Sequence, residues 1–380
     1  MNWAFSAAVG MVTTMVTSVS GLLTIYNGYY SRERLRNHGL KGFTTPMQKT
    51  YELYAKNYAK LKKRPELLFA VIDKLKDISS DTNQAERIYS GFIKTAMQVP
   101  ASTKGSHFDS HLFNRLFSQY PPDIYKKLES LAKNHILIHQ KNLDPKVIFP
   151  FYFQGIQGSG KTHAAKSMAK ALGVPMATLL LEGASIQDLI GTPIMGYSPG
   201  DPGRLLSAMT TTLMDPQTHE SYEDGILFID EFDRLLNAQD YDARALLTFM
   251  LKVLDPNVRS FYSEYLGINI KLPKTIILAG NFDIKDAALA DRFQIIVFPG
   301  FDRERRLNIT REVLVPDICN TYGLTPLELK PADWKAIEVI ATSSDKSTGM
   351  RDIEKAVLEY ISGLAFEKFN KEIEVAANSH

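Results

Sequence analysis

The sequence predicts an α/β fold in which a mainly parallel sheet is covered by helices on both faces and is followed by an α-helical subdomain. Short apolar runs at 151–153, 176–181, 226–229 and 275–279 alternate with helical or loop-forming stretches. This alternation is typical of parallel strands joined by helical crossovers. A glycine-rich loop separates the first run from a helical stretch, and the strand pattern stops at Phe301.

Composition indicates a globular chain of more than one domain. The 380 residues are 44% hydrophobic and 23% charged, and the formal net charge is +2. So small a net charge creates no overall field for nucleic acid. The single cysteine, Cys319, excludes an intrachain disulfide and any zinc site that needs two thiolates.

Residues 1–30 contain no charged side chain and are long enough to cross a bilayer as one helix. Four basic residues follow at once: Arg32, Arg34, Arg36 and Lys41. The positive-inside rule then predicts a single-pass membrane protein whose remaining chain lies on the cytoplasmic side, or an equivalent one such as an organelle matrix. Two alternatives stay open: an interfacial or buried helix, and a cleaved targeting segment.

Two other regions have helical periodicity. Residues 44–98 place tyrosines and leucines on two faces, which predicts a small helical domain, and the turn-forming stretch 99–111 follows as a linker. A further helical pattern covers 125–142, and the chain from Arg303 to about Lys371 is helical again.

The glycine loop reads GIQGSGKT and fits the pattern G-x-x-x-x-G-K-[ST] between a strand and a helix. Such a loop binds phosphate because its backbone N–H groups converge on the oxygens without obstruction by Cβ atoms, and the helix dipole favours negative charge. The cofactors it predicts are ATP and Mg²⁺, with Lys161 on the β/γ oxygens and Thr162 on the metal. The candidate binding residues are Gly155, Gly158, Ser159, Gly160, Lys161 and Thr162.

A second motif, ILFIDEFD, is an apolar strand that ends in carboxylates. Asp230 is placed to complete the Mg²⁺ environment and Glu231 to polarise the attacking water. A third apolar strand ends at Asn281, which could orient water or the γ-phosphate. Arg292 and Arg351 are candidates to stabilise the transferred phosphoryl group, one across a subunit boundary and one from the helical subdomain.

Together these residues resemble the AAA+ ATPases and, within them, the ATPase module of Lon proteases. The resemblance runs from about Val99 to Glu367. Besides GIQGSGKT, it includes LEGASIQDLIGTPIMGYSPGDPGRLLSAM, ILFIDEFDRL, ALADRFQIIVFPGFDRERRLNIT and GMRDIEKAV.

The resemblance implies a homo-oligomeric ring, in this family a hexamer, that acts on a protein substrate. By this resemblance Asn281 is sensor 1, Arg292 is the arginine finger supplied to a neighbouring subunit, and Arg351 is sensor 2. Tyr197 would lie on the first pore loop and grip a polypeptide, although Ser198 stands where the family favours an apolar residue. Lon continues into a peptidase domain with a Ser-Lys dyad. Because only a short tail follows Lys368, we expect no peptidase activity of this chain's own, and a separate peptidase partner stays open.

The sequence thus predicts four regions: a transmembrane helix (1–30), a helical N-terminal region with a linker (31–110), an AAA+ α/β nucleotide-binding domain (111–300) and an α-helical lid with a short tail (301–380). The expected function is that of a membrane-anchored ATP hydrolase that remodels, unfolds or threads a protein. An ATP-gated membrane scaffold with slow hydrolysis is the first alternative. A nucleic-acid motor is the second, and it is disfavoured because no basic residue adjoins Tyr197 before Arg204.

Overall fold

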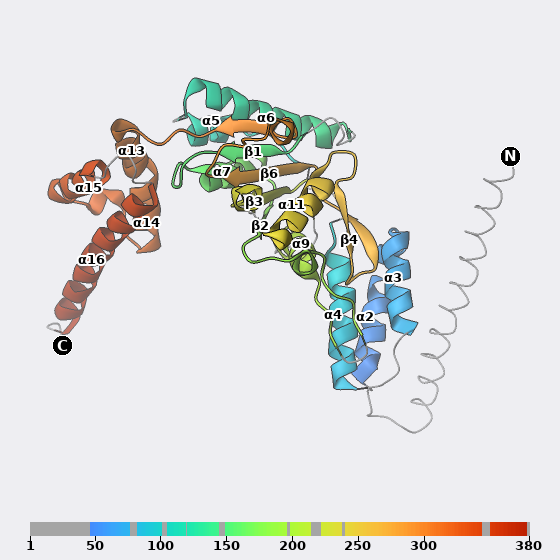
Figure 1. The fold of residues 1–380 in the computed structure, drawn as a ribbon. Coiled ribbons are helices and arrows are strands. Elements are labelled where there is room, and N and C mark those ends of the chain that lie inside the picture. The colour runs from blue at the N-terminus through green and yellow to red at the C-terminus, as the bar shows by residue number, and fades with distance from the viewer. Residues whose placement is uncertain are drawn as a thin grey trace. The chain divides into compact units, whose positions relative to one another are not determined.

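The computed structural model shown in Figure 1 describes residues 46–76, 82–100, 105–118, 120–143, 149–195, 198–213, 222–237, 240–343 and 350–377. The chain divides into two compact units, and one of them combines the described residues up to Val99 with Gln187–Thr210 and Tyr262–Ile270. The predicted transmembrane segment, 1–30, lies outside the described residues. Within those residues, no helix combines the length and apolar character that a membrane span requires.

The first unit contains three N-terminal helices, α2 (Pro46–Leu61), α3 (Pro65–Lys76) and α4 (Asn83–Gln98). Thr82 caps α4 by accepting a hydrogen bond from the Ala85 N–H, and buried Thr50 and Ser90 join α2 to α4 through their hydroxyls, 2.9 Å apart. Helices therefore cover most of the stretch 44–98, where periodicity predicts helical structure.

The second unit is built on a five-stranded sheet in the order β2-β3-β6-β1-β7, and every neighbouring pair is parallel. Four of its strands match the predicted apolar runs, whereas the edge strand β7 was not predicted. The strands are β1 (Phe151–Gln154), β2 (Met176–Leu180), β3 (Ile226–Asp230), β6 (Thr275–Gly280) and β7 (Gln294–Val297). The order places β6 between β1 and β3, so the carboxyl ends of three central strands are neighbours.

Both faces of the central strands β1, β3 and β6 are buried, as is typical of parallel sheets. On one face Phe153 and Phe228 pack in a cluster with Phe113, Leu128 and Met168 of the covering helices, and Figure 1 shows α5 and α6 along this side. Alternate residues such as Tyr152, Leu227 and Leu278 point to the other face and are equally buried. The helices of this region are α5 (Ser110–Phe117), α6 (Pro122–Gln140), α7 (Lys161–Leu172), α10 (Asp233–Asn237), α11 (Tyr241–Leu254) and α12 (Ala287–Ala290).

Four further elements overlap the segments Gln187–Thr210 and Tyr262–Ile270, which belong to the first unit. They are α8 (Ile186–Ile190), α9 (Gly203–Thr212) and a two-stranded sheet of β4 (Ser260–Ser263) and β5 (Ile268–Lys271).

The end of the second unit is helical, as the sequence predicts. Val315, Cys319, Ile337, Val357 and Ile361 form the core of this lid. Its elements are α13 (Arg303–Ile309), a π-helix (Thr310–Leu314), α14 (Val315–Thr321), a short 3-10 helix (Pro326–Glu328), α15 (Pro331–Ser343) and α16 (Met350–Ala377).

Candidate active site

The glycine loop lies between β1 and α7, where its backbone takes conformations that favour glycine. Gly158 and Gly160 have φ angles of 76° and 87°. Gly155 has no room for a side chain, because a Cβ atom there would lie 2.3 Å from the Phe298 carbonyl oxygen. The Gly155 N–H donates to the Gly280 carbonyl of β6 at 3.2 Å, which ties the start of the loop to the centre of the sheet.

Lys161 begins α7, and its ammonium group points back toward the loop. It donates to the carbonyls of Gly155 at 2.6 Å and Ile156 at 3.0 Å, and to the Asn281 side-chain oxygen at 3.0 Å. Burial lowers the pKa of Lys161, while the carboxylates of Asp230 and Asp233 oppose that change. The ammonium group is thus already held at the mouth of the loop by acceptors that phosphate oxygens can replace.

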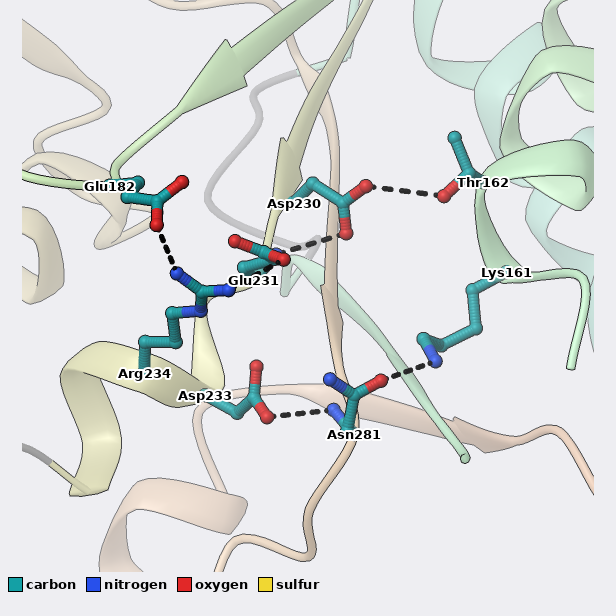
Figure 2. A network of polar contacts seen from close by, with 8 residues as sticks. All are labelled: Lys161, Thr162, Glu182, Asp230, Glu231, Asp233, Arg234 and Asn281. Atoms are coloured by element: carbon teal, nitrogen blue, oxygen red, sulfur yellow. Dashed lines mark hydrogen bonds and ion pairs between the residues drawn. The ribbon is translucent and has the colours of Figure 1, made fainter. Parts of the chain in front are cut away.

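Thr162 and Asp230 form the candidate Mg²⁺ position. The Thr162 hydroxyl donates to Asp230 Oδ2 at 3.2 Å, so the two side chains converge from α7 and from the end of β3 (Figure 2). Hydroxyl and carboxylate oxygens are the ligand types that suit Mg²⁺. These residues therefore fit the metal that the motifs imply.

Glu231 follows β3 with a φ angle of 55°, a region that non-glycine residues rarely occupy and that costs of the order of 1–3 kcal/mol. Its N–H donates to Asp230 Oδ1 at 3.0 Å. Its carboxylate accepts from Arg234 at 3.1 Å, and Arg234 also donates to Glu182 at 2.6 Å, just beyond β2 (Figure 2). The candidate catalytic carboxylate is therefore oriented by an arginine on its own turn.

A cavity of about 430 Å³ collects most of the predicted residues. Its polar lining includes Gly158, Gly160, Lys161, Thr162, Asp230, Glu231, Asn281 and Arg351. The remaining wall contains aromatic and aliphatic side chains, namely Tyr120, Phe301, Ile309, Val313 and Leu314. A polar end beside an apolar recess fits a nucleotide, with the phosphates at the glycine loop and the base among the apolar side chains.

The other predicted residues lie elsewhere. Gly155 and buried Ser159 belong to the loop but do not line the cavity. Arg292 is exposed and borders a separate pocket of about 120 Å³, with Phe149, Leu251 and Leu254. Tyr197 lies outside the described residues, between Met195 and Ser198, which pair in an antiparallel bridge. The roles assigned to all these residues stay predictions.

Sequence reasoning missed several residues that complete the site. Arg234 and Asp233 stand within the acidic motif itself, where the run DEFDR was the available signal. The fold brings three more residues to the site, Glu182, Tyr120 and Phe301, and no local sequence pattern identifies them.

A phosphate-binding loop after one parallel strand, with carboxylates after a nearby strand, defines a P-loop nucleotide-binding protein. Comparison with known proteins narrows the class. Residues 151–301 match the family described as "ATPase family associated with various cellular activities (AAA)". This stretch is an AAA-family domain. Its match to a family of ATPases supports ATP hydrolysis in general terms.

Lon proteases are similar to this chain across the ATPase region. The Lon protease of Campylobacter jejuni is 27% identical over 303 residues, which are 76% of this chain and 36% of that protein. The human peroxisomal Lon protease homolog 2 is 28% identical over 235 residues, 60% of this chain and 26% of that protein. The Lon protease of Aquifex aeolicus is 27% identical over 223 residues, 58% of this chain and 26% of that protein. The chain therefore carries a Lon-like AAA+ ATPase module and spans about a quarter to a third of the length of these relatives.

The close contact at Gly155 gives a test of the loop. We expect Gly155→Ala to lower ATP affinity at least about tenfold, because the new methyl group must displace the Phe298 carbonyl or the loop. Titration with a fluorescent ATP analogue measures this. Gly363→Ala is the matched control, since nothing lies within 4 Å of a Cβ there. Unchanged affinity in Gly155→Ala would contradict the loop geometry.

Proposed function

We propose that this protein is a membrane-anchored, Lon-like AAA+ ATPase that hydrolyses ATP in an oligomeric ring to remodel, unfold or thread a protein substrate. The observation that supports ATP hydrolysis most directly is the convergence of Lys161, Thr162, Asp230, Glu231 and Asn281 on one cavity. They come from the ends of the adjacent parallel strands β3 and β6 and from α7, the helix that follows the glycine loop.

Binding of ATP begins with an exchange of partners at Lys161. The ammonium group leaves the Gly155 and Ile156 carbonyls and neutralises phosphate oxygens, while the loop N–H groups and the N-terminus of α7 stabilise the remaining charge. Mg²⁺ bound by Thr162 and Asp230 would neutralise charge that develops on the phosphate oxygens. Arg351, at the start of α16, lines the same cavity and adds positive charge from the lid.

Hydrolysis requires a water molecule directed at the γ-phosphate. Glu231 polarises this water and accepts its proton, and its carboxylate must then turn from Arg234 toward the water. Asn281 orients the water or the γ-phosphate, because its side chain already reaches Lys161. The polar contacts of Figure 2 thus supply both a base and an orienting amide.

Assembly into a ring, in this class a hexamer, is supported by the position of Arg292. This arginine is absent from the lining of the cavity in its own chain and stands exposed beside another pocket. A guanidinium group so placed can serve a neighbouring copy, where it would stabilise the transferred phosphoryl group.

A polypeptide substrate is supported by the loop that contains Tyr197. Two antiparallel bridges, Thr192 with Asp201 and Met195 with Ser198, hold the residues that flank Tyr197, and Met195 is 69% exposed. An exposed apolar side chain on a loop that backbone pairing holds in place suits contact with an unfolded chain. The near-neutral net charge does not suit a strand of nucleic acid. Membrane anchoring rests on the apolar residues 1–30 and the basic residues that follow them.

Complementation between two inactive variants tests the ring. Arg292→Ala keeps its own cavity but lacks the arginine, whereas Glu231→Gln keeps the arginine but lacks the base. If Arg292 acts on a neighbour, random 1:1 mixing restores up to about a quarter of wild-type turnover, because one site in four combines an intact base with an intact arginine.

Each variant alone should lose about 10²-fold or more of its turnover. Mixing Arg292→Ala with the double variant Arg292→Ala/Glu231→Gln is the matched control and should restore nothing. Failure of the single variants to complement each other, although they co-assemble, would show that Arg292 does not act in trans.

Stimulation by substrate tests the proposed class of cargo. We expect an unfolded polypeptide to raise the ATP turnover of the full chain in detergent several-fold and single-stranded DNA to leave it unchanged. Tyr197→Ala should abolish the stimulation but retain basal turnover, while Tyr241→Ala, at a residue 85% exposed in the other unit, should retain both. Slow turnover indifferent to polypeptide would favour the ATP-gated scaffold instead, and stimulation by DNA alone would favour a nucleic-acid motor.

A further inference from the structure

We propose that Asp233 is a positioning residue for Asn281: its buried carboxylate fixes the backbone from which the Asn281 side chain reaches the γ-phosphate site. Tyr152 supports the Phe282 carbonyl in the same turn. This inference rests on the proposed ATP hydrolysis and gives roles to two residues, Asp233 and Tyr152, to which the nucleotide motifs assign none.

At the point where the sheet ends, the Asp233 side chain accepts a backbone hydrogen bond that a neighbouring strand would accept within the sheet. The Phe232 N–H donates to the Ala279 carbonyl at 2.9 Å, which ties the chain two residues beyond β3 to β6. The chain then turns into α10, and the next acceptor comes from a side chain. Asp233 Oδ2 accepts the Asn281 N–H at 2.9 Å (Figure 2). The position of Asn281 therefore depends directly on the residue two places after Glu231.

Tyr152 holds the other side of the turn. Its hydroxyl donates to the Phe282 carbonyl at 3.0 Å. Burial and, to a lesser degree, the Asp233 and Asp283 carboxylates raise the pKa of Tyr152 above its ordinary value, so the hydroxyl keeps its proton and stays a donor. A Cβ atom on Gly280 would lie 2.0 Å from this oxygen and 2.8 Å from the Asp233 Cβ. The absence of a side chain at 280 thus lets both groups approach the peptide that precedes Asn281.

Asn281 needs this support because its own side chain is exposed in the cavity. Its oxygen accepts from Lys161 Nζ at 3.0 Å, and Asn281 lies beyond the last residue of β6. The bond from its N–H to Asp233 therefore restrains the Asn281 backbone at a point where the sheet no longer does. Small displacements of a positioning group from its productive geometry reduce turnover by large factors.

The environment of Asp233 also argues against a purely structural role. The side chain is 1% exposed, and its second oxygen, Oδ1, is buried without a hydrogen-bond partner. Burying a carboxylate with an unsatisfied oxygen is unfavourable, and an apolar residue would avoid that cost. An apolar residue, however, would provide no acceptor for the Asn281 N–H.

The test compares ATP turnover, nucleotide affinity and thermal unfolding in variants of the full chain. Asp233→Ala should lower kcat about 10- to 100-fold and leave KM and the affinity for an ATP analogue nearly unchanged. Asp233→Asn, whose amide oxygen can still accept the Asn281 N–H, should recover most of the lost turnover. The double variant Asp233→Ala/Asn281→Ala should have the kcat of Asn281→Ala alone, because both changes remove the same function.

Asp224 provides a matched control. It is also fully buried and accepts the N–H groups of Gly105 and Ser106, but it precedes the amino end of β3 rather than following the carboxyl end. Asp224→Ala should lower the unfolding temperature without lowering kcat.

Three results would overturn the inference: an equal loss of affinity and kcat in Asp233→Ala, no recovery in Asp233→Asn, or losses that multiply with that of Asn281→Ala. If wild-type turnover does not exceed that of Lys161→Ala, the proposed ATP hydrolysis itself fails. Normal turnover in Asp233→Ala with loss in Lys161→Ala would remove only the positioning role.

Discussion

The parallel pairing of β6 with β1 on one side and β3 on the other is the constraint on which the site depends. Because side-by-side parallel strands end at the same edge, the pairing brings together the glycine loop, the two carboxylates and Asn281. Two backbone hydrogen bonds extend it past the strands, from the Gly155 N–H to the Gly280 carbonyl and from the Phe232 N–H to the Ala279 carbonyl. The polar turns are therefore fixed by the buried sheet beneath them.

The lid meets this edge through a few contacts that nucleotide can strengthen. The Met350 N–H donates to the Gly158 carbonyl at 3.4 Å, so the start of α16 touches the glycine loop next to Arg351. The π-helix and the residue before it form part of the apolar wall of the cavity, through Ile309, Val313 and Leu314. Pro316, which has no N–H to donate, follows two residues later, and the wider π turn accommodates it. A base bound against this wall would link the lid to the sheet.

Local sequence patterns were sufficient for the parts of the fold that are both apolar and continuous. The runs that became β1, β3 and β6 are buried on both faces, so their composition alone identified them. The run that became β2 exposes one face, including Leu180, but it is almost continuously apolar in sequence. Strand β7 was missed because it is short, lies at the edge and exposes Val297. The hairpin of β4 and β5 was missed for a similar reason, since its strands have four residues each and alternate in burial.

The same distinction applies to the site. Lys161, Thr162, Asp230 and Glu231 stand in contiguous motifs whose chemistry can be read directly from the sequence. The pairing of Arg234 with Glu182, 52 residues away, and of Asn281 with Asp233, 48 residues away, depends on how the strands are ordered. No spacing within the sequence encodes that order. The Lon-like resemblance supplied roles for Arg292, Arg351 and Tyr197, but their positions depend on the lid and the loops.

The most direct measurement of the central claim is an experimental structure of the full-length Glu231→Gln variant with ATP and Mg²⁺. The account predicts ATP in the cavity at the glycine loop, with Lys161 moved from the Gly155 and Ile156 carbonyls to the phosphates. It also predicts Mg²⁺ beside Thr162 and Asp230, and Asn281 facing the γ-phosphate with its N–H still bound to Asp233. ATP bound elsewhere, or bound in the cavity while Lys161 keeps both carbonyl partners, would contradict the account.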